Sequence, residues 1–156
     1  MGSDSARPAV LERMLGALNA HDVEAMVSCF AEDYVNETPA HSPRGFRGNQ
    51  QVRTNWAQIF GSVPDIHARI IDSNVDADQV WTEWDISGTR VDGAQFLMRG
   101  VVIFGLAAGA IASARFYLEP VEDTSGDVDT HTRRVTRGPV STGVSQDRAE
   151  MEGSDR

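Results

Sequence analysis

Lysine is absent from this chain of 156 residues, and all 14 basic residues are arginine. The 23 acidic residues outnumber them and give a formal charge of −9 at pH 7. A surface of this sign repels the phosphates of nucleic acids and the headgroups of anionic membranes. We therefore expect no nucleic-acid partner and no membrane partner.

Cysteine is almost absent as well, because Cys29 is the only one in the chain. A single thiol excludes an internal disulfide and a zinc site built from cysteines. Cys29 falls in an apolar stretch with helical spacing. A small buried hydrophobe is the favoured interpretation there, and a reactive thiol is the alternative.

Long hydrophobic runs are missing. The longest, residues 101–112, is interrupted by Gly105 and Gly109 and is shorter than a membrane span. Residues 1–10 show no apolar run behind a basic start, so we expect no secretory signal and a cytoplasmic protein. No phosphate-binding glycine loop, metal-spaced His/Asp cluster or nucleophile elbow is present, so we expect no cofactor and no metal.

Aromatic residues, leucine and isoleucine are missing from residues 121–156. Such a segment cannot bury enough apolar surface to offset the entropy lost on ordering it. We expect a flexible N-terminus over 1–7, one folded domain over 8–120, and a polar, disordered tail over 121–156, with docking on a partner as the alternative. A helical turn near 146–151 is the element expected within the tail.

The first half of the domain has the spacing of helices. Apolar residues recur at helical intervals over 8–18, over 23–30 after a capping Asp22, and over 49–61. A short strand over 34–38 and an irregular loop separate the second of these helices from the third.

The second half has the spacing of strands. From Asp65 onward the apolar period changes from 3.6 to 2. Strands over 66–75, 80–90, 95–105 and 110–120 are joined by short turns. Three helices with one short strand among them, followed by four antiparallel strands, predict an α+β domain. In it, a curved, mainly antiparallel sheet packs on three N-terminal helices.

Alternation along the strands places apolar and aromatic side chains on the sheet face that the helices cover. A packed core is one interpretation of this set, and a pocket for a flat apolar ligand is the other. Gly100 favours the pocket, because a larger side chain would fill the space. The candidate substrate-binding residues are Met14, Phe30, Tyr34, Trp56, Thr82, Trp84, Met98, Gly100 and Phe116.

Few polar side chains can reach this face. Asn36 and Thr38 can donate hydrogen bonds to an oxyanion, and His41 can carry a proton near neutral pH. We therefore take Asn36, Thr38 and His41 as the candidate catalytic residues. A solvent-facing position is the alternative for His41, and the arginines of the RGFRG segment are interpreted as part of a surface loop.

The opposite sheet face mixes apolar and charged side chains. Neighbouring strands are expected to set Glu83, Arg99 and Arg115 side by side as cross-strand ion pairs. A catalytic arginine–carboxylate site is one interpretation, but a position away from the pocket favours a homodimer interface. The residues assigned to this interface are Trp81, Glu83, Arg99, Arg115 and Tyr117.

Four segments carry a resemblance to a known superfamily: NAHDVEAMVSCFAEDYVNETP, FRGNQQVRTNW, VWTEWDISGTRVDG and IASARFYLEP. Together with the order of helices and strands, these segments resemble the nuclear transport factor 2-like superfamily over residues 8–120. This superfamily includes ketosteroid isomerases, SnoaL-type polyketide cyclases and limonene epoxide hydrolases. The resemblance implies a conical half-barrel around an apolar pocket, and a dimer formed through the convex sheet face.

The catalytic groups of these relatives are not matched in this chain. Met14, Thr38 and Gly100 stand where ketosteroid isomerases have a tyrosine and two aspartates. Phe116 stands where the cyclases and epoxide hydrolases have an aspartate.

Two functions are therefore expected. One is a cofactor-independent enzyme of isomerase, cyclase, hydratase or epoxide hydrolase type, acting on a small apolar, possibly cyclic compound. The other is a non-catalytic protein that binds an apolar small molecule.

Overall fold

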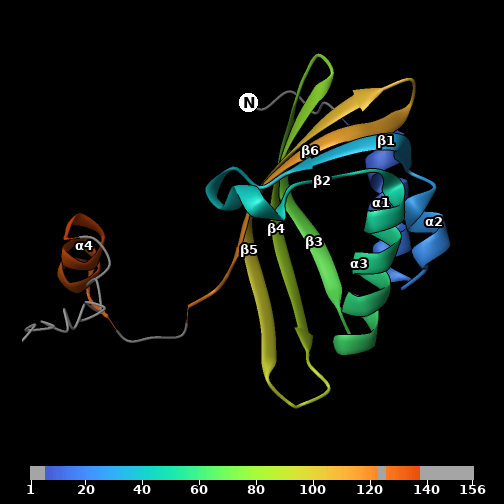
Figure 1. Ribbon diagram of the computed structural model, residues 1–156. Coiled ribbons are helices and arrows are strands. Elements are labelled where there is room, and N and C mark those ends of the chain that lie inside the picture. Colours follow the sequence, from blue (N-terminus) through green and yellow to red (C-terminus); the bar gives the residue numbers. More distant parts are fainter. Residues whose placement is uncertain (1–5, 123–125, 138–156) are drawn as a thin grey trace, which may run out of the picture. The chain divides into compact units, whose positions relative to one another are not determined.

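The computed structural model describes residues 6–122 and 126–137 (Figure 1). The chain divides into two units, Met1–Val121 and Glu122–Arg156. The elements of the first unit are α1 (Ala9–Asn19), α2 (Val23–Val27), β1 (Phe30–Glu37), the 3-10 helix η1 (Pro39–Arg44), β2 (Phe46–Arg47), α3 (Asn49–Ser62), β3 (His67–Asp76), β4 (Gln79–Thr89), β5 (Gln95–Ala107) and β6 (Ala110–Pro120). The second unit contains α4 (Val128–Thr136).

The strands form one sheet of six, in the order β2-β1-β6-β5-β4-β3. Strands β3 to β6 are an antiparallel meander, whereas β1 pairs parallel to β6 and antiparallel to β2. Helices α1, α2 and α3 lie on the same side of this curved sheet (Figure 1). The predicted α+β fold, with three helices on a curved, mainly antiparallel sheet, is confirmed.

Local sequence signals explain where α2 begins, and strand pairing explains where it ends. The Asp22 carboxylate caps α2 by accepting a hydrogen bond of 3.0 Å from the Ala25 N–H, as predicted. The helical spacing continues to Phe30, yet Phe30 is the first residue of β1 and pairs with Ile111 of β6. The Ile111 N–H also donates to the Cys29 carbonyl at 2.9 Å. Pairing with β6 therefore overrides the helical pattern.

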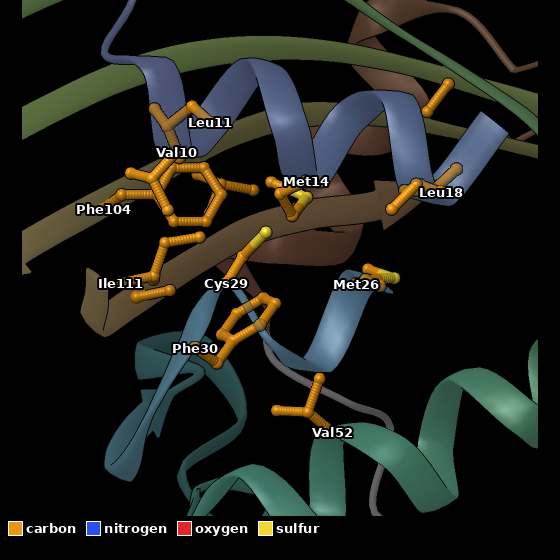
Figure 2. Close-up of a cluster of buried hydrophobic side chains, with 14 of the residues drawn as sticks. Val10, Leu11, Met14, Leu18, Met26, Cys29, Phe30, Val52, Phe104 and Ile111 are labelled. Carbon is orange, nitrogen blue, oxygen red and sulfur yellow. The ribbon is translucent and has the colours of Figure 1, made fainter. Parts of the chain in front are cut away.

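The core lies between α1 and the sheet. Figure 2 shows the apolar side of α1, from Val10 to Leu18, facing Phe104 of β5 and Ile111 of β6. Cys29 is buried among these side chains, in the turn after α2 rather than on a helix face. The structure thus agrees with the favoured interpretation of Cys29 as a small buried hydrophobe.

Hydrogen bonds from side chains fix the end of α1 to the start of β3. The Asn19 amide donates to the Ala68 carbonyl at 2.9 Å and accepts from the Ala68 N–H at 2.7 Å. The His21 ring lies 2.8 Å from the Ile66 carbonyl through Nε2 and stacks on Phe60. These contacts satisfy backbone groups at the start of β3.

The outer sheet face, which is turned away from α1, α2 and α3, carries different ion pairs from those predicted. Glu83 forms no ion pair within the described residues. The register of β4 and β5 sets Arg99 opposite Asp85, with Nε 3.8 Å from Oδ1. The parallel pairing of β1 with β6 brings Glu37 within 3.8 Å of Arg115. The predicted cluster of Glu83, Arg99 and Arg115 is therefore wrong.

Helix α4 lies within the segment predicted to be a disordered tail. The Asp127 carboxylate caps it, accepting from the Thr130 N–H at 2.8 Å, and Arg133 and Arg134 lie in its last turn, where they complement the helix dipole. All of its residues are exposed. The helical turn predicted near 146–151 lies outside the described residues, and the boundaries 8–120 and 121–156 stay predictions.

None of the helices in the described ranges has both the length and the apolarity that a membrane span requires.

Gly100 marks a close approach between two backbones. Its φ is +150°, and a Cβ added there would lie 2.1 Å from the Tyr117 carbonyl oxygen of β6. The prediction that Gly100 leaves room for a ligand is therefore wrong, because the backbone of β6 occupies that space. Only glycine combines this φ with so short a distance to the next strand.

We expect Gly100→Ala to lower the free energy of unfolding by about 3 kcal/mol or more, through steric overlap and backbone strain. Gly16→Ala is the matched control. Gly16 is exposed on α1 with nothing within 4 Å of an added Cβ, so this change should raise stability by about 0.5–1 kcal/mol. Urea unfolding followed by circular dichroism measures both, and an unchanged midpoint for Gly100→Ala would contradict the close approach.

Candidate functional site

A cavity of about 290 Å³ opens between helix α3 and the sheet. Its walls come from β1, η1, β2, α3, β4, β5 and β6, and also include Ile66, which precedes β3. Most of the lining side chains are apolar. The volume lies near the lower limit of pockets that bind small molecules.

The structure brings many of the predicted site residues together around this cavity. These lining residues are Phe30, Tyr34, Asn36, Thr38, Trp56, Met98 and Phe116.

A second, smaller cavity of about 40 Å³ lies toward α1. Met14 and Trp84, both predicted to bind substrate, line this one and not the larger cavity. Phe30, Trp56 and Phe116 contribute to both linings, so these aromatic rings stand between the two spaces. The smaller space has almost entirely apolar walls.

Thr82 and Gly100 lie outside both cavities. The Thr82 side chain is buried, and its hydroxyl donates to the Val102 carbonyl at 2.6 Å and accepts from Trp84 Nε1 at 2.6 Å. Both of its hydrogen-bonding roles are therefore used within the core. The backbone of β6 fills the space beside Gly100.

His41 also lies outside both cavities. It belongs to η1, and its Nε2 atom is 2.8 Å from Glu119 Oε1 in a partly exposed pair. The sequence pattern predicts an irregular loop over residues 40–48 and does not predict η1. This 3-10 helix carries His41 to the surface and Arg44 to the cavity wall.

Tyr34 and Asn36 form a buried hydrogen bond at the polar wall of the cavity. They lie two residues apart on β1, so their side chains share one face of the strand. Tyr34 is 1% exposed, and its hydroxyl donates to Asn36 Oδ1 at 2.8 Å. Burial raises the pKa of Tyr34, so the phenol stays protonated at neutral pH. With Oδ1 engaged, the NH₂ group of Asn36 is the part left for a ligand.

Asn55 of α3 repeats this arrangement on the facing wall. Its Oδ1 atom accepts a hydrogen bond of 2.8 Å from Gln51 Nε2, one helical turn earlier. The Asn55 side chain also lines the cavity, and its NH₂ group is likewise left to donate. Asn55 could not be singled out from the sequence, because an amide on a helix surface carries no recognisable signal.

Arg44 is the ionised residue of the cavity lining, and sequence analysis placed it in a surface loop. It is the last residue of η1, it is exposed, and it lines the cavity. Within the described part of the chain, the lining contains no aspartate, glutamate or histidine. The polar wall therefore offers amide N–H groups, the Thr38 hydroxyl and one guanidinium, so the cavity is rich in hydrogen-bond donors.

Solved structures share this fold at low sequence identity. An LEH-like epoxide hydrolase from M. tuberculosis is 21% identical, with a TM-score of 0.62 over 72% of this chain and 81% of that one. AclR from Streptomyces galilaeus, which is proposed to be a hydroxylase, is 14% identical, with a TM-score of 0.63 over 74% and 80%. These likenesses show a common fold.

A further structure has a ketosteroid isomerase-like fold and contains trimethylamine. This protein from Catenulispora acidiphila is 18% identical, with a TM-score of 0.63 over 72% of this chain and 87% of that one.

No curated protein matches the sequence. The SnoaL-like domain matches residues 11–114, which span α1 to β6. The chain therefore belongs to the SnoaL-like domain family.

Proposed function

We propose that the larger cavity binds a small, mainly apolar molecule through an oxygen acceptor. The orientation of two amides carries this proposal. Asn36 and Asn55 line the cavity, and their oxygens are engaged by Tyr34 and Gln51 at 2.8 Å each. Each amide therefore has its NH₂ group left to donate. A carbonyl, carboxylate or ether oxygen accepts such bonds, whereas a ligand that only donates leaves both NH₂ groups without a partner.

The apolar walls determine the rest of the ligand. Phe30, Trp56 and Phe116 present aromatic rings, and Met98 adds a flexible thioether. Rings of this kind pack well against flat apolar molecules, and each Å² of apolar surface removed from water contributes about 25 cal/mol. A cyclic or aromatic compound with one acceptor oxygen fits both the aromatic lining and the two amide donors.

Binding without catalysis is the function that the lining supports best. Proton abstraction needs a base whose pKa lies near the working pH. Tyr34 does not meet this condition, because burial raises its pKa. His41 is paired with Glu119 at the surface, outside the cavity, so we no longer assign it the role of proton carrier.

A cofactor-independent enzyme is the second candidate, of isomerase, cyclase, hydratase or epoxide hydrolase type. The observation that favours it is the gathering of Asn36 and Thr38 on one wall, because donors placed in this way can stabilise an oxyanion. Relatives of the same fold include an LEH-like epoxide hydrolase. In such an enzyme Asn36 and Thr38 donate hydrogen bonds to the oxyanion that forms on the substrate.

Isothermal titration with 2-acetylnaphthalene, a flat neutral ketone, tests the proposal. We expect Asn36→Leu to weaken ketone binding about fivefold, because one hydrogen bond is worth about 1 kcal/mol and leucine has a similar shape. Naphthalene, which has no acceptor, should bind both proteins equally. Asn74→Leu, at an exposed position on β3, is the matched control. Equal ketone affinity for Asn36→Leu and the unmodified protein would contradict the proposal.

The same samples separate the two candidates. Mass spectrometry after overnight incubation should recover the ketone unchanged if the protein only binds it. Conversion that disappears in Asn36→Leu would favour the enzyme.

Tyr34→Phe tests the hydrogen bond that orients Asn36. Removing the hydroxyl leaves a buried amide oxygen without its donor, so the free energy of unfolding should fall by about 1–3 kcal/mol. Thr54→Val is the control, because Thr54 is exposed on α3 and its change should stay within about 0.5 kcal/mol. Urea unfolding measures both. If the two variants are equally stable, the buried hydrogen bond does not contribute as described.

We also propose that a second copy of this chain binds the outer sheet face. Trp81 is 48% exposed and Tyr117 is 39% exposed there, beside the half-buried Leu97 and Val101. Aromatic side chains in such a setting are typical of protein interfaces. Arg99 and Arg115 lie at 3.8 Å from their carboxylates, so they can also pair across a two-fold contact.

Sedimentation equilibrium at micromolar concentration tests this assembly. The unmodified protein should have twice the monomer mass of 17.0 kDa. Trp81→Glu should give a monomer, because it places a charge in the apolar part of the interface. Val91→Glu, at a residue 75% exposed between β4 and β5, should leave the dimer intact. A monomeric unmodified protein would refute the proposal.

A further inference from the structure

We infer that the ligand of the larger cavity is an apolar carboxylate, and that Arg44 binds its charged group at the cavity opening. This inference rests on the proposed function and adds the chemical class of the ligand. It depends on three observations about the described residues: the position of Arg44, its lack of a carboxylate partner, and the direction in which the walls become apolar.

The position of Arg44 is fixed by its neighbours in the sheet. Phe46 pairs with Asn36 across β2 and β1. A Cβ added to Gly45 would lie 3.2 Å from the Asn36 carbonyl oxygen, so the backbone that follows Arg44 runs against β1. Arg44 is exposed and also lines the cavity, which places it at the opening on the same side as Asn36.

Arg44 has no ion-pair partner within the part of the chain that the structure describes. Several other arginines do have one, such as Arg53 with Glu24 at 2.8 Å and Arg90 with Asp92 at 2.6 Å. Among the described residues of the first unit, Arg13 and Arg47 also lack one, but unlike Arg44 they do not line the cavity. A guanidinium presents parallel N–H groups that match the two oxygens of a carboxylate. Together with the Asn36 amide, it forms a wall suited to an anionic oxygen.

The smaller cavity, toward α1, has more apolar walls than the larger one that Arg44 lines. The aromatic side chains of Phe30, Trp56 and Phe116 stand between the larger cavity and the smaller one, whose lining reaches Met14 and Trp84. A ligand therefore fits in one orientation, with the carboxylate at the opening and the apolar ring toward α1.

The net charge of −9 does not oppose this assignment. It repels anions at a distance, but at physiological salt such repulsion is largely screened beyond about 8 Å. Contact with the nearest guanidinium therefore decides the preference between a charged and a neutral ligand of the same shape.

The experiment compares 2-naphthoate with 2-acetylnaphthalene, a neutral compound of nearly the same shape, by isothermal titration. We expect the unmodified protein to bind the carboxylate about fivefold more tightly, since a hydrogen bond to a charged group is stronger than a neutral one. Arg44→Gln should abolish this preference, because it weakens carboxylate binding more than ketone binding. Arg47→Gln should retain the preference, because Arg47 is exposed on β2 and does not line the cavity.

The outcomes separate this inference from the proposed function. If the protein binds neither compound, both the proposed function and the inference about Arg44 fail. If it binds the ketone at least as tightly as the carboxylate, or if Arg44→Gln keeps the preference, the proposed function stands and the role of Arg44 is overturned. A preference that falls when salt is raised from roughly 50 to roughly 500 mM, both in the unmodified protein and in Arg47→Gln, supports the ion pair.

Discussion

The parallel pairing of β1 with β6 is the constraint on which the site depends. It sets Asn36 opposite Ala114 and Glu37 opposite Arg115, so a strand from the first third of the chain lies beside the last strand of the domain. A parallel pair needs a long crossover, and α3 with the meander β3 to β5 supplies it. The polar side chains of β1 thereby face the aromatic residues of α3 and β6 across one cavity.

The cost of burying polar groups explains why the amides are arranged as donors. An amide buried without a partner costs a few kcal/mol, and Asn36 is only 8% exposed. Tyr34 offsets part of this cost by donating to the amide oxygen. The same bond fixes the amide orientation before any ligand arrives, so little rotational freedom remains to be lost on binding.

The fold was predictable because its signals are local, whereas much of the site depends on contacts between distant segments. The change of apolar period and the turns locate α3 and the meander. Helical spacing fails at Phe30, because pairing with Ile111 decides its conformation. Sequence alone cannot tell whether Gly100 leaves a space or admits the neighbouring backbone of Tyr117. Arg44 reaches the cavity only because η1 forms, and six residues with two prolines give no periodic signal.

Affinity and selectivity come from different walls of this cavity. Arg44 is exposed, and an ion pair in water is typically worth 1 kcal/mol or less. Covering roughly 120 Å² of a ligand ring with Phe30, Trp56 and Phe116 contributes about 3 kcal/mol. The aromatic walls therefore supply most of the binding energy and select the shape of the ligand. The guanidinium and the amides discriminate among ligands of that shape by the charge of one oxygen group. The exposure of Arg44 limits this discrimination to about fivefold.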